Sequence, residues 1–482
     1  MNQTLNNNLT NNNSNKNLKS KISELWTDIV DSIKGTQRDY TKGSITKAIL
    51  LLSIPMVLEL VMESIFAVVD IFFVSKLGSD AVATVGTTES MMTIVYAIGI
   101  GLSMSATAIV ARRTGEKNKE GAAVAAVQAI WVSILASLPI AVLGIIFSKD
   151  LLALMGMQGE IINEGFLYTA VMLGGNVVIM LIFIINAIFR GVGDAAIAMR
   201  VLWIANLINI ILDPCLIFGW GPFPELGIWG AAVATNIGRG IGVLIQFYYL
   251  QKKSGRIQIL QHHLKIQWEI MKNLIRVSLG GIGQFIIATS SWVGLVRIMN
   301  EFGSEAVAGY TIAIRIVVFS ILPSWGMSNA AATLVGQNLG AGKPDRAEKS
   351  VWWCAFVNMI FLVLIAILFI LYSEFLVGLF TQEQNVIAIG AECLRYLSYG
   401  YIFYAYGMIM IQAFNGAGDT ITPTIINFFC FWLFEIPVAL WASFVLGMDE
   451  RGVFLAVLLA ESLIGIVGIV LFKKGKWKTR KV

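Results

Sequence analysis

Parts of this chain occur twice, and the same offset in residue number separates every repeated pair. The segment Gly78-Ser79-Asp80-Ala81-Val82-Ala83 returns as Gly303-Ser304-Glu305-Ala306-Val307-Ala308, and Phe189-Arg190-Gly191-Val192-Gly193-Asp194 returns as Phe414-Asn415-Gly416-Ala417-Gly418-Asp419. A fixed period without insertions indicates two homologous halves. Because many secondary transporters build a central cavity from two duplicated halves, which opens to either side of the bilayer, the repeat points to transport.

The composition is that of an integral membrane protein. Hydrophobic residues make up 57% of the chain and charged residues 13%, whereas about a quarter of a soluble domain is charged. The apolar runs are continuous and reach the roughly 20 residues that a helix needs to cross hydrocarbon. We therefore predict an all-α integral membrane fold, with twelve transmembrane helices in two pseudo-symmetric six-helix lobes. The predicted spans are 46–74, 87–111, 122–147, 165–188, 196–218, 228–250, 274–300, 307–334, 351–372, 388–414, 422–446 and 452–472.

Basic residues in alternate connections predict the orientation in the membrane. Lys and Arg bias short loops toward the cytoplasm, and they gather between the halves and at the end of the chain. We expect a multi-pass protein of the cell membrane with both termini cytoplasmic, and halves related by an axis along the membrane normal. The predicted division is a cytoplasmic tail with an amphipathic helix (1–44), an N-lobe (45–250), a cytoplasmic linker (251–272), a C-lobe (273–472) and a basic cytoplasmic tail (473–482).

The tail and the linker leave alternatives open. Apolar residues at helical spacing over 21–34 fit a helix on the inner membrane surface or an ordinary helix against the cytoplasmic loops. The linker pair His262-His263 has no Cys or carboxylate cluster beside it in the sequence, which favours a solvated basic linker over a metal site. All four cysteines fall inside spans, so no disulfide framework or zinc site is predicted. Nothing indicates nucleic-acid binding.

The first span carries an acidic face. Glu59, Glu63 and Asp70 are spaced by four and seven residues, which places them within about 40° on one side of a helix. Charged side chains are costly in hydrocarbon, so this face is expected to look into the bundle or a watery cleft. Pro55, one turn earlier, removes a backbone hydrogen bond and gives the helix a place to bend. The alternative is that Glu59 and Glu63 are neutral and tie helices together.

The fifth span carries a second polar pair. Asn209 and Asp213 lie on one face, four residues apart, and Asp213 is followed by Pro214. Together with Asp70, this pair could hold Na⁺ if both acids are ionised, or H⁺ if burial keeps one acid protonated. Thr235 and Asn186 are candidates to complete the set. No metal site is predicted beyond possible Na⁺ at Asp70, Asn209 and Asp213.

Several motifs resemble those of the multidrug and toxic compound extrusion (MATE) family, over roughly residues 40–472. They include Ser53-Ile54-Pro55, Val69-Asp70, Asn209 through Asp213-Pro214, and Gly336-Gln337-Asn338-Leu339-Gly340. The resemblance implies that Asp70, Asn186, Asn209, Asp213 and Thr235 form a first-lobe network linked to cation coupling. It also implies that span 1 bends at Pro55, as in the prokaryotic branch.

The sequence departs from part of the family in span 7. Many relatives carry a glutamate there, whereas Ala288 stands near the aligned position and the main polar residues are Gln284 and Arg297. The pattern therefore resembles a DinF-like transporter that couples through its first lobe alone. Candidates for a C-lobe cavity are Gln284, Trp292, Arg297, Gln412 and Glu435, with pairing inside the bundle favoured for the charged ones.

These features predict a secondary antiporter, not an enzyme. It would export organic, mostly cationic or lipophilic compounds by alternating access, in exchange for H⁺ or Na⁺, with no other cofactor and as a monomer in the bilayer. Cation binding at Asp70 and Asp213 would alter the bend near Pro55 and disfavour drug binding. The alternatives are a flippase for a lipid-linked saccharide, a dedicated metabolite exporter and, with less support from the loops, a polytopic membrane enzyme. No P-loop pattern is present, so direct use of ATP is not expected.

Overall fold

A computed structural model describes residues 26–35, 38–253 and 255–480, and within these ranges every regular element is a helix. The helices of the first half are α2 (Ile45–Ser75), α3 (Ser79–Gly115), α4 (Lys119–Ile146), α5 (Ser148–Leu154), α6 (Glu160–Gly174), α7 (Asn176–Val192), α8 (Ala195–Ile217) and α9 (Ile228–Gln251). A short linker helix, η1 (Gln261–Leu264), precedes the second half.

The second half repeats this order. Its helices are α10 (Trp268–Met299), η2 (Asn300–Phe302), α11 (Ser304–Gly340), α12 (Pro344–Gly378), α13 (Gln384–Tyr399), α14 (Tyr401–Gly416), α15 (Ile421–Asn427), η3 (Phe428–Glu435), α16 (Ile436–Leu440), η4 (Trp441–Val445), α17 (Glu450–Lys473) and η5 (Lys476–Thr479). The segments from α15 to η4 form one continuous helical stretch in which η3 and η4 are π-helical.

The twelve predicted spans correspond to the helical segments that the structure contains, with ends that differ by up to about two helical turns. Ten of these segments are long and apolar enough to cross a membrane, and α2 and the α13–α14 segment complete the set. Two spans are interrupted, one between α6 and α7 at Gly175 and the other between α13 and α14 at Gly400. The offset between these two glycines is the one that separates Gly78 from Gly303, so the interruption belongs to the repeat.

Turns also repeat. Gly78 and Gly303 precede α3 and α11 with φ of 104° and 94°, and Gly193 and Gly418 follow α7 and α14 with φ of 85° and 82°. Side chains with a Cβ rarely adopt these angles. The sequence segments that recur therefore code for the same backbone conformations.

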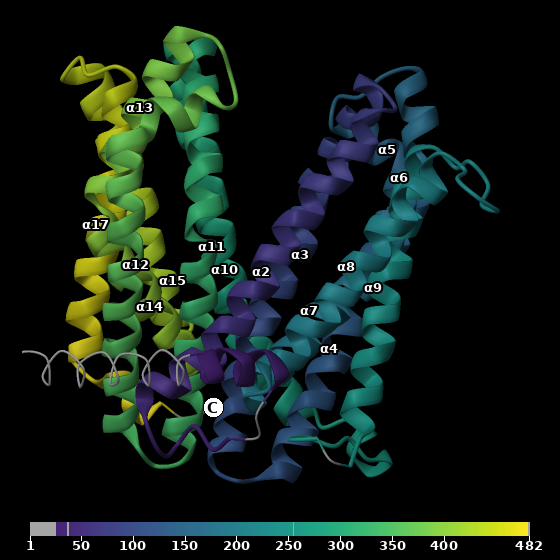
Figure 1. The fold of residues 1–482 in the computed structure, drawn as a ribbon, viewed down its shortest axis with the longest axis vertical. Helices are drawn as coiled ribbons and strands as arrows, with labels where there is room; N and C mark the ends of the chain where they lie inside the picture. The colour runs from purple at the N-terminus through teal and green to yellow at the C-terminus, as the bar shows by residue number, and fades with distance from the viewer. Residues whose placement is uncertain (1–25, 36–37, 254, 481–482) are drawn as a thin grey trace, which may run out of the picture.

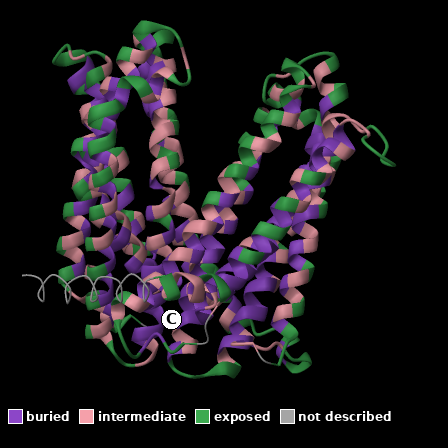
Figure 2. Ribbon diagram, in the orientation of Figure 1, coloured by how far each residue is buried: buried purple, intermediate pink, exposed green. Residues whose placement is uncertain are grey.

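The two halves diverge toward one end and meet at the other (Figure 1). Figure 2 shows that buried residues concentrate where they meet, toward the end of the molecule that carries the C-terminus. Helices α3 and α11 make this contact without room for side chains: a Cβ on Gly115 would overlap the carbonyl of Gln337, and a Cβ on Gly340 would overlap the carbonyl of Arg112. The repeat pairs Gly115 with Gly340 and Arg112 with Gln337, so the contact is two-fold symmetric. The C-terminal ends of α3 and α11 therefore meet at this junction.

Large apolar side chains cover the outer surfaces of the helices. Leu138 and Ile146 on α4 are exposed, and so are Leu364 and Leu371 on α12. Continuous apolar exposure of this kind is tolerated where lipid, and not water, surrounds the helix. The four cysteines are free thiols within the helices, three of them buried.

The N-terminal helix predicted over 21–34 is described in part. Residues 26–34 are helical, and residues 21–25 lie outside the described part of the chain. Trp26 is exposed, Ser32 is buried, and Asp28 pairs with Lys47 at the start of α2. The described turns therefore contact the first span. This contact is compatible with a helix on the membrane surface and with a helix against the cytoplasmic loops.

Candidate cation and substrate site

Glu59 on α2 is buried and contacts two polar side chains of α7. Its Oε1 accepts hydrogen bonds from Asn186 Nδ2 at 2.9 Å and from Arg190 Nη1 at 2.8 Å. Asn186 also accepts a hydrogen bond from Gln246 at 2.6 Å. The guanidinium lies against the buried carboxyl group, so Glu59 ties α2 to α7, which is the helix contact that the sequence alternative described.

Glu63, one turn further along α2, also meets an arginine. Its two carboxylate oxygens accept from Arg239 Nη2 at 2.6 Å and from Asn206 Nδ2 at 3.0 Å. Arg239 is itself buried, and its guanidinium lies 5.4 Å from the centre of the Phe66 ring. Helices α8 and α9 thus face the acidic side of α2, as expected for a stripe that avoids lipid.

The last acid of the stripe joins the polar pair of α8. Asp70 lies within electrostatic reach of Asp213, Glu89 and Arg239. Asn209 donates a hydrogen bond to Thr235 Oγ1 at 3.0 Å, and Asn209, Asp213 and Thr235 are all buried. No described residue donates to Asn209 Oδ1 or to either carboxylate oxygen of Asp213. Three buried oxygens on α8 therefore lack a donor, and their chemistry suits a proton or an alkali cation.

Asn186 does not join this set, because its amide is committed to Glu59 and Gln246. The sequence interpretation also missed Arg239 and treated Arg190 only as part of a turn. Helical spacing carried a signal for both, since Asn186 and Arg190, like Thr235 and Arg239, are four residues apart on one face. Pro55 is buried within α2, which continues unbroken past it.

The C-lobe candidates separate into three places. Gln284 and Asn415 exchange hydrogen bonds at 3.0 and 3.1 Å, and Gln412 joins them by accepting from Asn415 at 2.9 Å. Trp292 and Glu435 line a cavity of about 210 Å³, in which Glu435 accepts from Ser291 Oγ at 2.7 Å. Arg297 lies outside it: its side chain is 73% exposed and pairs with Glu301 at 2.7 Å. The expectations that Arg297 lines a cavity or pairs inside the bundle are thus wrong, because it sits at the helix end.

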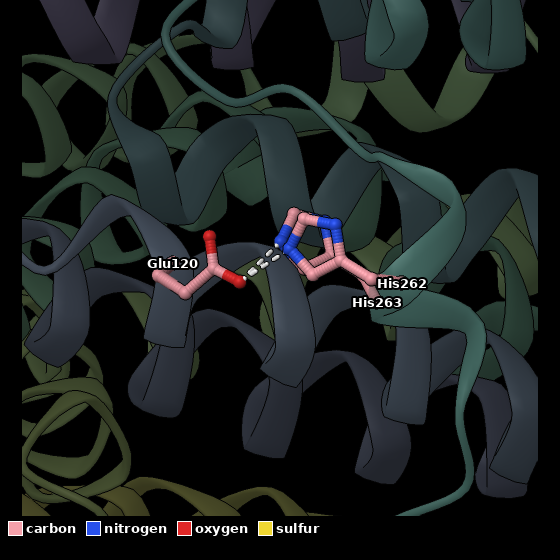
Figure 3. Close-up of side chains that lie close together, drawn as sticks. All are labelled: Glu120, His262 and His263. Atoms are coloured by element: carbon pink, nitrogen blue, oxygen red, sulfur yellow. Dashed lines mark hydrogen bonds and ion pairs between the residues drawn. The ribbon is translucent and has the colours of Figure 1, made fainter.

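The histidine pair of the linker has a carboxylate beside it after all, contributed by α4. His262 Nε2 and His263 Nε2 lie 2.7 and 2.8 Å from one oxygen of Glu120 (Figure 3). However, the backbone N–H of Leu260 donates to His263 Nδ1 at 2.9 Å, so a neutral His263 carries its proton on Nε2, the nitrogen that lies 2.8 Å from Glu120. A metal ligand would need the opposite tautomer. The cluster is better described as a hydrogen-bonded clasp between the linker and α4.

The comparisons with known proteins agree with the fold. The family model described as MatE matches residues 55–215 and 282–441. This chain belongs to the MatE family of membrane transporters. It is 28% identical to a protein of Thermotoga maritima named as a probable multidrug resistance protein NorM, over 91% of this chain and 94% of the relative.

Two further similarities bear on function. The chain is 26% identical to a protein of Shewanella oneidensis named as an FAD transporter, over 88% of this chain and 93% of the relative. It also superposes on a solved structure described as the outward-facing conformation of a multidrug resistance MATE family transporter, with a TM-score of 0.84 and 25% identity, covering 92% of this chain and 98% of that one.

Proposed function

We propose that this chain is a cation-coupled antiporter that exports organic, mostly cationic or lipophilic compounds. The observation that carries the proposal is the set of donor-less oxygens of Asp213 and Asn209 beside Asp70. A buried carboxylate without a partner is expensive, so it holds a proton or a cation. A site that alternates between the two sides can exchange this ion for a substrate. Relatives named as multidrug resistance proteins support the substrate class.

Competition is the proposed mechanism. H⁺ or Na⁺ at Asp70 and Asp213 neutralises the acidic face of α2, which weakens its attraction for an organic cation. The ion also alters the interactions that hold α2 near Pro55, and this change favours release of the drug. Release of the ion on the other side restores the acidic face. No further cofactor enters this cycle, and the transport involves no bond-making step.

The orientation of the cycle follows from the basic loops. If both termini are cytoplasmic in the cell membrane, the halves meet on the cytoplasmic side and diverge outward. One chain contains both halves, so we propose that the monomer is sufficient. The lobes are taken as 45–250 and 273–472, joined by the linker 251–272.

The test is dye efflux from energised cells that make the protein at matched membrane levels. Wild type is expected to export ethidium, and Asp213→Asn and Asp70→Asn are expected to lose coupled export. Asp150→Asn, which changes an exposed acid outside the set, serves as the control. A Na⁺ pulse and a protonophore, applied separately, identify the ion. Full coupled efflux by both variants would overturn the proposed site.

A dedicated metabolite exporter is the second candidate. Arg190 and Arg239 place two guanidinium groups in the first half, where they could meet phosphate groups, and one relative is named as an FAD transporter. Flavins secreted into the medium by cells with and without the chain would distinguish the candidates. Secretion without dye export would favour this alternative. A lipid-linked saccharide flippase would need the same arginines to be available to pyrophosphate.

A further inference from the structure

The cavity of the second half contains two carboxylates and an aromatic wall. Glu435 from η3 and Glu461 from α17 both line it. Its volume is about 210 Å³. The aromatic side chains around it are Trp292, Tyr310, Tyr401, Tyr404 and Phe431, and most of the remaining lining is aliphatic.

The repeat shows that this cavity is the counterpart of the acidic network in the first half. Ala288, Leu295 and Ile314 line it, and in the alignment of the two halves they take the places of Glu63, Asp70 and Glu89. Conversely, Glu435 and Glu461 take the places of Ile210 and Asn236. The second half thus lacks acids at these positions of the first two helices of the repeat and carries acids on its last two helices, in the lining of the same cavity.

These carboxylates have no cationic partner in the described part of the chain. Glu435 has one hydrogen bond, from Ser291, and no ion pair of Glu435 or Glu461 is formed there. The first half differs, because Glu63 at the equivalent place pairs with Arg239. The hydroxyl of Tyr401, 3% exposed, lies near Ser320 but outside hydrogen-bonding geometry with it. The cavity therefore combines two carboxyl groups that lack a cationic partner with a hydroxyl that lacks a hydrogen-bond partner.

The chemistry of the lining selects the ligand. An alkali ion is held by oxygen ligands that replace its hydration shell, whereas the lining of this cavity is mainly apolar and aromatic. An ammonium group on a small aromatic or alkyl body matches it better, since tyrosine and tryptophan faces attract cations and carboxylates supply the counter-charge.

We propose that the C-lobe cavity binds a small organic cation, with the ammonium group against Glu461 and Glu435 and the body between Trp292 and the tyrosines. This site is separate from the Asp70–Asp213 set and requires no transport. It therefore goes beyond the proposed function, and its binding is measurable whether or not ethidium is exported.

The test is equilibrium binding of radiolabelled benzyltrimethylammonium to the full-length protein in lipid nanodiscs. Wild type is expected to bind the probe. Glu461→Gln and Glu435→Gln are each expected to raise the Kd by at least about tenfold, because each removes one carboxylate while keeping the shape of the side chain. Glu374→Gln, an exposed acid paired with Arg395, is the matched control. Neopentylbenzene, the neutral isostere of the probe, is expected not to compete.

Each other outcome overturns the proposal. Absence of probe binding to wild type removes the site. Unchanged affinity in both cavity variants, or loss of binding in Asp213→Asn alone, places the probe elsewhere. Competition by neopentylbenzene as strong as that of the unlabelled cation shows an apolar cavity without charge recognition. If a glutamine variant fails to assemble, Trp292→Leu provides a second variant, which is expected to weaken binding without changing the charge.

Discussion

Gln284 takes the place in the second half that Glu59 takes in the first, and the partners of the two residues correspond as well. Glu59 accepts a hydrogen bond from Arg190 at 2.8 Å, and Gln284 exchanges hydrogen bonds with Asn415, which is the repeat counterpart of Arg190. The same pair of helices is thus tied by an ion pair in one half and by an amide pair in the other. The tie is structural in both halves, and only one of them carries charge.

This correspondence predicts the outcome of exchanging one pair for the other. Arg190→Asn alone leaves Glu59 as an unpaired buried charge and is expected to destabilise the protein by about 3–5 kcal/mol. The double variant Glu59→Gln/Arg190→Asn recreates the amide pair of the second half and is expected to recover most of that loss. Thermal unfolding in detergent measures both. A double variant no more stable than Arg190→Asn would show that the two ties are not equivalent.

The glycine contact between α3 and α11 predicts a steric effect on the junction of the halves. Gly115→Leu must push the carbonyl of Gln337 away, and overpacking of this kind typically costs about 1–3 kcal/mol. We expect a lower Tm and reduced efflux. Gly86→Ala on the same helix has no atom within 4 Å of its new Cβ, so it should leave both unchanged. Equal behaviour of the two variants would contradict the close contact.

Arg239 predicts the affinity of the first half for cations. Its guanidinium pairs with Glu63 and lies near Asp70, so it competes with a cationic substrate for the acidic face. Arg239→Gln is expected to lower the apparent KM for ethidium about fivefold, which corresponds to about 1 kcal/mol for a partly solvated pair. Arg297→Gln, an exposed arginine paired with Glu301, is the control. An increase in KM would instead assign Arg239 to substrate binding.

The linker clasp predicts a dependence on pH. Hydrogen bonds from His263 and His262 hold the pKa of the Glu120 carboxyl below its usual range. A lowered pKa means that the contact is present above the usual glutamate range and is lost as the pH falls through and below it. We expect an acid-tolerant protease to cleave the linker increasingly as the pH falls below about 4.

Glu120→Gln should loosen the clasp at neutral pH, because the amide lacks the charge that the histidines favour. Trypsin cleavage at Lys252 and Lys253 measures this, and Glu116→Gln, whose carboxylate pairs with Arg113 nearby, is the control. Indistinguishable cleavage of the two variants would mean that the clasp does not hold the linker. Gln128 and Trp131 also bond the linker backbone, so a partial effect is expected.

The sequence was sufficient for the fold because its strongest signals are local. The length of an apolar run identifies a membrane span without reference to neighbouring helices. The recurring glycine turns mark the ends of equivalent helices in the two halves. The face of Glu59, Glu63 and Asp70 followed from helical spacing in the same way. These are properties of one helix or of the alignment of the chain with itself, and tertiary contacts do not alter them.

The partners of these side chains were not predictable, because they depend on which helix crosses at which depth. Asn186 was expected beside Asp213, but α7 crosses α2 at the level of Glu59 and uses the amide there. Of the residues that line the C-lobe cavity, only Trp292 and Glu435 were predicted from the sequence to do so. Glu461 was missed because it is a single acid within an apolar span and belongs to no motif. Its significance appears only when α17 is placed against η3.

The crossed contacts of Gly115 with Gln337 and of Gly340 with Arg112 also have a meaning for evolution. Contacts related by two-fold symmetry are typical of a homodimer, so they fit an ancestor of half this length that paired with a second copy of itself. In such an ancestor one mutation altered both sides of the junction at once. After gene fusion the two halves could mutate independently. Arg112 and Gln337 now occupy the two positions that one residue of such an ancestor would have filled in both copies.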